Sequence, residues 1–349
     1  MKTAHETAAA LLGVWALDAC SPEEAELVTD HLPECATCAA EAARLRGAAD
    51  LLGAAAAPPE WLRARTMERA KARRSAASPC PGYAEPYAAQ VSVLDSLLGE
   101  LSAADWRVNV IYDWHVQDVV AHLAATDGLV AAGVGTGVGT GAEGGESGGP
   151  PPAVGDSVLG DLLAASTAAA IDRERRRPPD LTRASWRAQA DALCRALPAD
   201  AAHRVPGIRL RISDLVVARA FETWVHSDDI ATAVRRRLPP PLPRHLAPIA
   251  ALGVRSLPKA LAVTRADRPA AVAQVVLDGP GGGEWRLGLG AGDGGGAPPE
   301  PAVRLRMDVL EFCFLAGGRR DPATVDAEVV GDRDLGRELL AAAPSFSGP

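Results

Sequence analysis

The feature that most constrains the fold of this chain is the segment HLPECATC at residues 31–38, which has the spacing H-x3-C-x2-C. Two cysteines three positions apart at the start of a helix direct their thiolates to one side. A histidine at the end of the preceding helix can reach the same point. A structural zinc ion takes four nitrogen or sulfur ligands in tetrahedral geometry. The spacing therefore predicts a small zinc-binding helical module with His31, Cys35 and Cys38 as three of the ligands.

The fourth ligand of this predicted site must come from another part of the module. His5 and Cys20 are the two candidates, and the spacing alone leaves both open. Six cysteines in 349 residues do not make a disulfide scaffold, so the cysteines outside the motif are expected to be free thiols. Cys20 is also a candidate redox partner of the zinc cysteines.

Helix signals outline this first module. Helices are predicted over residues 5–17, from Ser21 to about residue 32, and from about residue 35 to 52. Ser21 with Glu24 forms a capping box, and a proline stands at the first helical position. A proline-rich segment after residue 57 predicts a domain boundary near residue 78. We expect a basic stretch at 63–74 to be a solvated helix face.

After the first module, the sequence predicts helices up to about residue 262 and then a mixture of strands and helices. Helices are expected over 83–103, 114–131, 158–177, 181–196, 211–235 and 243–262. The glycine-rich stretch 133–156 is interpreted as a flexible insertion, because a phosphate loop needs a preceding strand and a following Lys-Ser/Thr. Strand-like segments follow at 271–278, 284–289, 302–307 and 324–331, with helical segments at 308–317 and 332–343.

These patterns predict a mainly α chain with a C-terminal α+β domain. The predicted domains are 1–75, a zinc-binding helical module; 79–240, a helical bundle; and 241–349, an α+β domain.

A second group of metal-ligand residues lies in the predicted bundle. Glu222 and His226 are four apart in a helical stretch and so share one face. His122 lies in a helix packed on its apolar side and can point into the bundle interior. Two histidines and one glutamate, with a fourth position open, is the ligand set of a catalytic zinc ion. The competing interpretation is a salt-bridged glutamate with unrelated histidines.

The first module resembles the zinc-binding anti-sigma factor domain over residues 1–55. The resemblance rests on H-x3-C-x2-C preceded by an upstream His or Cys. It favours His5 over Cys20 as the fourth ligand of a closed site. It implies a sigma factor as a partner of this module, and in some family members oxidation of the cysteines releases that partner.

Residues 80–345 resemble the mycothiol-dependent maleylpyruvate isomerase family. The resemblance rests on W-x-V-x-D-V-V-A-H-L at 114–123, on E-x3-H-x2-D at 222–229, and on a Gly-Arg-Arg stretch at 318–320. It implies a DinB-like metal-binding four-helix bundle with His122, Glu222 and His226 as ligands and Asp229 nearby, and a sterol-carrier-like C-terminal domain.

The same resemblance implies a thiol-dependent reaction. Mycothiol, or another low-molecular-weight thiol, would be activated at the open zinc position and attack a small electrophilic substrate, giving isomerisation or S-transfer. Arg319 or Arg320 is the candidate clamp for a substrate carboxylate through a bidentate pair of hydrogen bonds.

Three function classes therefore stay open. The first is a thiol-dependent metalloenzyme, the second an anti-sigma-like regulator whose bundle senses a thiol or ligand without catalysis, and the third a scaffold with two structural metals. The balance of 36 basic against 44 acidic residues argues against a nucleic-acid surface. No apolar run is long enough for a membrane span, and charges interrupt the N-terminal apolar segment, so a cytoplasmic protein is expected.

Overall fold

The computed structural model describes residues 4–56, 76–135, 156–205, 210–264, 270–290 and 300–346. The chain divides into two compact units, Met1–Arg73 and Arg74–Pro349. The basic stretch at 63–74 and most of the glycine-rich stretch at 133–156 lie outside the described residues. The predicted mainly helical chain with a C-terminal α+β part is confirmed.

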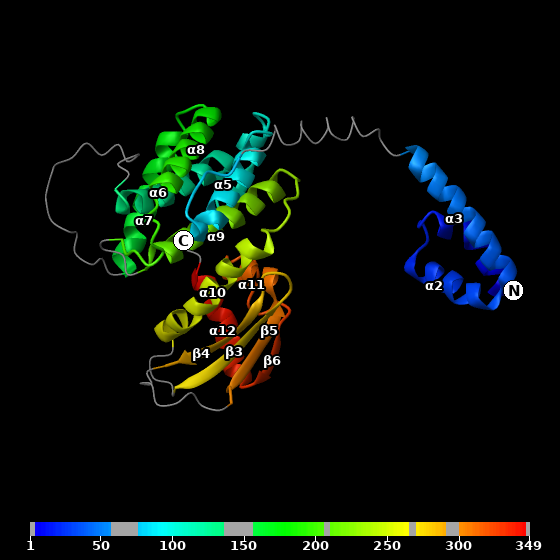
Figure 1. The fold of residues 1–349 in the computed structure, drawn as a ribbon. Helices are drawn as coiled ribbons and strands as arrows, with labels where there is room; N and C mark the ends of the chain where they lie inside the picture. The colour runs from blue at the N-terminus through cyan, green and yellow to red at the C-terminus, as the bar shows by residue number, and fades with distance from the viewer. Residues whose placement is uncertain are drawn as a thin grey trace, which may run out of the picture. The chain divides into compact units, whose positions relative to one another are not determined.

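The described part of the first unit, residues 4–56, contains three α-helices (Figure 1). The Ser21 side chain accepts the Glu24 amide while the Glu24 carboxylate accepts the Ser21 amide, so the predicted capping box is present. A short 3-10 turn containing Pro33 separates the second helix from the third. The elements are α1 (Ala4–Ala16), α2 (Pro22–His31), η1 (Leu32–Glu34) and α3 (Ala36–Ala56).

The second unit begins with a helical bundle (Figure 1). Its four core helices contact one another in a ring, in the order α5, α8, α6 and α9, and α7 packs against α6. Their apolar faces meet in a core that includes Leu94, Leu123 and Trp186. The helices are α5 (Glu85–Leu98), α6 (Val116–Gly133), α7 (Asp156–Glu174), α8 (Pro179–Ala196) and α9 (Ile212–Ala233).

The helix α6 begins two residues later than the sequence predicts. Trp114 and His115 form the short strand β2 (Trp114–His115), which pairs with β1 (Asn109–Ile111). Asp118 then fixes the start of α6, because its carboxylate accepts the His115 backbone amide at 2.9 Å. His122 lies four residues after Asp118, which is about one helical turn.

The C-terminal part is a four-stranded sheet in the order β4-β3-β5-β6, with β3 and β5 parallel and the other pairs antiparallel. Alternate residues of β5 are buried, because α11 and α12 contact one face of that strand. The elements are α10 (Pro243–Thr264), β3 (Ala271–Asp278), β4 (Gly283–Leu289), β5 (Val303–Asp308), α11 (Val309–Ala316), β6 (Glu328–Gly331) and α12 (Arg333–Ala342).

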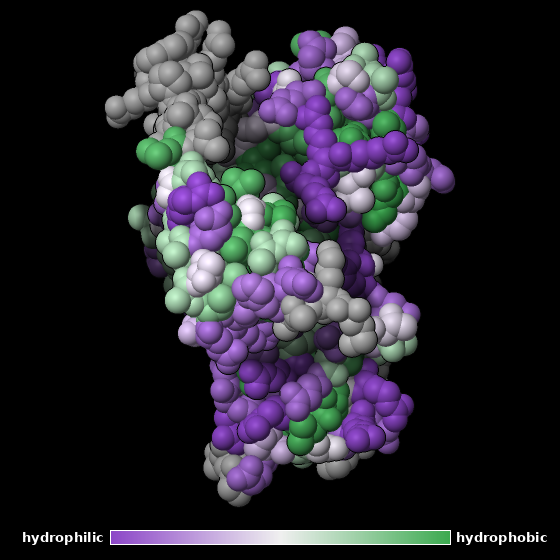
Figure 2. All heavy atoms as spheres, turned by 90° about the vertical axis from the view of Figure 1, so that its right-hand side faces the viewer, coloured by the Kyte–Doolittle hydropathy of each residue, from purple (hydrophilic) through white to green (hydrophobic). Residues whose placement is uncertain are grey.

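Helix α10 connects the sheet to the bundle. It contacts β4 on one side and α9 and α5 on the other, so a single hydrophobic core runs from the bundle into the sheet. Large apolar side chains are exposed only at scattered positions of the described chain, and Figure 2 shows hydrophilic and hydrophobic residues intermixed on the viewed face. None of the described helices is long and apolar enough to cross a membrane.

Candidate metal centre

Folding brings the predicted ligands together in two separate groups. Within each group the candidate ligand atoms all lie within 4.8 Å of one another. One group lies in the first unit, and the other lies inside the bundle of the second unit. The groups are His5, His31, Cys35 and Cys38, and His122, Glu222 and His226.

Both bundle histidines are oriented by hydrogen bonds on the ring nitrogen that faces away from the group. His122 Nδ1 lies 3.1 Å from Thr167 Oγ1 on α7, so Nε2 faces the group. His226 Nδ1 lies 3.0 Å from Asp229 Oδ2, which leaves its Nε2 for a ligand. Burial lowers the pKa of His226, which favours the neutral imidazole that metals bind. Such outer contacts are typical of metal-ligating histidines.

Glu222 presents a single oxygen to this group. Its Oε1 lies 2.5 Å from His122 Nε2, and its Oε2 accepts a hydrogen bond from Arg219, one turn earlier on α9. Burial alone would raise the pKa of Glu222, but the Arg219 charge and the contact with His122 hold it well below its usual range. Glu222 is therefore an ionised oxygen donor, as a divalent metal requires.

A buried network of polar side chains is connected to Glu222 through Arg219. Tyr87 on α5 donates its hydroxyl to Asp127 Oδ2 at 2.8 Å, and Arg219 Nε donates to Asp127 Oδ1 at 2.8 Å. Asp127 is fully buried, and Arg219 is 7% exposed. This network of hydrogen bonds connects α5 and α6 to the segment of α9 that carries two candidate ligands.

Asp229 extends the network to the C-terminal domain. It accepts a bidentate pair of hydrogen bonds from Arg319, which lies just after α11. Burial would raise the pKa of Asp229, but the hydrogen bonds from His226 and Arg319 outweigh burial and lower it. An ionised Asp229 keeps the proton of His226 on Nδ1 and directs the Nε2 lone pair to the candidate site.

This geometry predicts that an Asp229→Ala variant binds metal in the bundle about 10–100-fold more weakly, because His226 loses its Nδ1 acceptor. The measurement is a competitive chelator titration in a Cys35→Ser/Cys38→Ser background, which removes the first group. The control is Asp228→Ala, since Asp228 makes none of the described hydrogen bonds to His226. Equal affinities in the two variants would contradict the prediction.

The group in the first unit contains His5 and not Cys20. His5 Nδ1 lies 3.1 Å from His31 Nε2, 3.7 Å from Cys35 Sγ and 3.8 Å from Cys38 Sγ. Four nitrogen and sulfur donors around one point match a closed structural zinc site. The geometry supports His5 as the fourth predicted ligand, and metal binding by this group stays a prediction.

Both arginines proposed from the sequence as carboxylate clamps already hold carboxylates of this chain. Arg319 is bidentate on Asp229, and Arg320 is bidentate on Glu311 at 2.7 and 3.0 Å. Arg320 also lies over the Phe314 ring. A role of either arginine on substrate stays a prediction, and it requires the corresponding ion pair to open.

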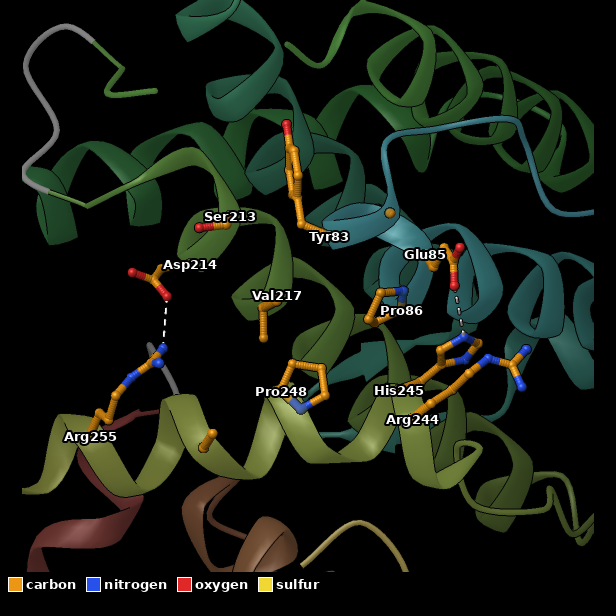
Figure 3. A pocket seen from close by; sticks show the side chains of 12 residues that line it. Tyr83, Glu85, Pro86, Ser213, Asp214, Val217, Arg244, His245, Pro248 and Arg255 are labelled. Atoms are coloured by element: carbon orange, nitrogen blue, oxygen red, sulfur yellow. Dashed lines mark hydrogen bonds and ion pairs between the residues drawn. The ribbon is translucent and has the colours of Figure 1, made fainter. Parts of the chain in front are cut away.

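A cavity of about 280 Å³ lies between the starts of α5 and α9 and one side of α10 (Figure 3). None of the bundle ligands lines it. One ion pair crosses the two layers, because Arg255 binds Asp214 at 2.8 Å. His245 Nε2 lies 4.0 Å from Glu85, beyond hydrogen-bond distance, and burial lowers the pKa of His245. The Arg255–Asp214 pair joins α10 to the bundle, so we interpret this cavity as part of the domain contact.

Comparison with known proteins connects the bundle with one family. Residues 87–231 match the family model of the mycothiol maleylpyruvate isomerase N-terminal domain. The uncharacterized proteins MT0041 and Rv0036c of Mycobacterium tuberculosis, from strains CDC 1551 / Oshkosh and ATCC 25618 / H37Rv, are each 28% identical to this chain over 260 residues. Those alignments cover 73% of this chain and 91% of each relative.

Two solved structures are also similar. The crystal structure of the mycothiol-dependent maleylpyruvate isomerase has a TM-score of 0.43 and 16% identity, and covers 68% of this chain and 88% of that chain. A mutant of that enzyme has a TM-score of 0.42 and 14% identity, with coverage of 70% and 91%. The family-model match at residues 87–231 thus supports the mycothiol maleylpyruvate isomerase family for the helical bundle of this chain.

Proposed function

We propose that the second unit is a mycothiol-dependent metalloenzyme of the maleylpyruvate isomerase type, with a zinc ion held by His122, Glu222 and His226. The observation that carries the proposal is that these three donors lie close together. Each side chain also makes a hydrogen bond through a second atom that does not face the candidate site. Two neutral imidazoles and one carboxylate suit zinc, and three protein ligands leave a coordination position for another molecule. The family match of the bundle supports a thiol as that molecule.

Each residue of the site has a distinct task in this proposal. A bound zinc ion would lower the pKa of a thiol and favour its nucleophilic thiolate form. Arg219 offsets the negative charge of Glu222 and limits it to one donor oxygen. Asp229 fixes the tautomer of His226, and Thr167 fixes the ring of His122. The small electrophile, isomerised or joined to the thiol, is the predicted second substrate.

A second function is supported by the separate first unit. We infer from its four-donor group a closed zinc site. The sequence resemblance of residues 1–55 implies an anti-sigma-like domain with a sigma factor as partner. In this alternative the bundle binds a thiol or ligand and regulates without turnover. The predicted DinB-like and sterol-carrier-like relationships of the second unit belong to the first proposal.

The deciding experiment combines metal analysis and turnover. We expect two zinc ions per wild-type chain and one in the Cys35→Ser/Cys38→Ser variant. Both proteins should isomerise maleylpyruvate, or join an activated alkene to mycothiol, only when the thiol is present. One zinc ion in the double-serine variant without any thiol-dependent turnover would favour the regulator. Absence of metal from that variant would contradict the bundle site itself.

A further inference from the structure

The cavity of about 280 Å³ in Figure 3 has an apolar middle and two polar ends. Pro86, Val217 and Pro248 supply the apolar surface, from α5, α9 and α10 respectively. The charges at one end are already neutralised, because Arg255 binds Asp214 at 2.8 Å. Its volume lies close to the lower limit of the range of about 300–1,000 Å³ for small-molecule sites. A ligand of this cavity is therefore small, with an apolar part in the middle and its charged groups at the other end.

That other end carries polar groups that lack partners within the described chain. Figure 3 shows Glu85, His245 and Arg244 grouped there. His245 is 6% exposed, and its Nε2 is buried without a hydrogen-bond partner. Glu85 Oε2 lies 4.0 Å from this nitrogen, and the Glu85 side chain is 58% exposed. Arg244 is exposed, and no acidic side chain of the described residues pairs with its guanidinium.

The pair of Glu85 and His245 matches a cationic hydrogen-bond donor. Burial and the neighbouring Arg244 charge lower the pKa of His245, so its ring is neutral at neutral pH. When the proton is on Nδ1, the Nε2 lone pair is an acceptor. The separation of 4.0 Å is too long for a direct hydrogen bond, but an ammonium group between the two atoms can donate to both. The exposed Glu85 side chain can turn to admit such a group.

The same end also offers a partner for a carboxylate. A guanidinium binds a carboxylate through two parallel hydrogen bonds. Arg244 lies in the first turn of α10, where the helix dipole also favours negative charge. An α-amino acid carries an ammonium and a carboxylate group on one carbon atom. Its head group therefore complements Glu85, His245 and Arg244 together.

We propose that this cavity binds a free α-amino acid with a small apolar side chain. The ammonium group donates to Glu85 and His245 Nε2, the carboxylate binds Arg244, and the side chain packs on the apolar middle. The bound amino acid contacts α5, α9 and α10, so it joins the bundle to the C-terminal domain and stabilises the folded chain. None of the bundle ligands lines the cavity, so this site does not depend on the proposed metal or thiol.

Isothermal titration of the full chain with three ligands tests the two halves of the head group. N-acetyl-L-leucine lacks the ammonium charge of L-leucine, and L-leucinamide lacks the carboxylate. We expect L-leucine to bind with a Kd of about 1 mM or tighter. Each analogue should bind about tenfold or more weakly, because it loses hydrogen bonds between charged groups.

Three variants locate the binding site. Glu85→Gln and Arg244→Gln should each weaken L-leucine binding about tenfold or more, and both positions are exposed, so the fold is retained. The matched control is Glu300→Gln, which removes an exposed carboxylate outside the cavity and should leave the affinity unchanged. An amino acid can also chelate a zinc ion, and binding of that kind would not respond to Glu85→Gln.

The proposal would be overturned by the absence of saturable L-leucine binding to the wild type. Equal affinity for L-leucine and N-acetyl-L-leucine would overturn it as well. So would an unchanged affinity for L-leucine in either Glu85→Gln or Arg244→Gln. Metal content and turnover enter none of these measurements, so the proposed function is tested separately.

Discussion

A His226→Ala variant is expected to purify without metal in its bundle. His226 supplies one of three protein donors, and the remaining pair, His122 and Glu222, leaves two positions open to water. Transition-state stabilisation by a catalytic metal is worth several kcal/mol, so thiol-dependent turnover should fall about a thousand-fold or more. The measurement is metal content and turnover in the Cys35→Ser/Cys38→Ser background.

The matched control for this variant is His203→Ala. His203 is an exposed histidine of the same unit and belongs to neither group of candidate ligands. Its replacement should leave metal content and turnover unchanged. A His226→Ala protein that keeps one metal ion and its activity would contradict both the ligand assignment and the proposed enzyme.

The second large effect is expected from Arg219→Met. This change leaves Asp127 fully buried without its cation and removes the partner of Glu222. Breaking a buried ion pair by removing one partner costs about 3–5 kcal/mol, because the remaining charge is uncompensated. The expected result is a loss of that size in the free energy of unfolding, measured by urea titration in chelator and followed by hydrogen exchange of α5 and α9.

An exposed ion pair provides the comparison. Arg337 and Asp334 are three apart on α12, and their side chains are 76% and 68% exposed. Arg337→Met should change stability by no more than about 0.5 kcal/mol. Adding Asp127→Asn to Arg219→Met should restore part of the lost stability, because it removes one uncompensated charge. A loss below about 1 kcal/mol in the single variant would contradict the expected cost of leaving Asp127 buried without its cation.

The sequence predicted most elements because their signals are local. The capping box at Ser21, the prolines at helix starts and the alternating pattern of β5 each depend on neighbouring residues. Helix α5 is shorter than expected and ends at Leu98, followed by Gly99. The hairpin at Trp114 was missed, since two strands of two or three residues leave almost no periodic signal.

The candidate ligands were predicted from their spacing and from a family resemblance. The residues that form the hydrogen-bond network around these ligands were not predicted. Arg219 lies one turn before Glu222, and this i,i+3 spacing is a signal that could have identified it. Asp127, Tyr87 and Thr167 come from other helices. Their contacts depend on the rotation of each helix in the bundle, which no local pattern specifies.

The contact between Asp229 and Arg319 has a consequence for recombination among related chains. Arg319 belongs to the C-terminal domain, yet it holds the carboxylate that orients a candidate ligand in the bundle. The hydrophobic core also continues through α10 into the sheet. A chimera that keeps this bundle and takes its last hundred residues from a relative would inherit part of its metal affinity from the donor. In the proposed enzyme, selection on the metal site would therefore also act on the loop that follows α11.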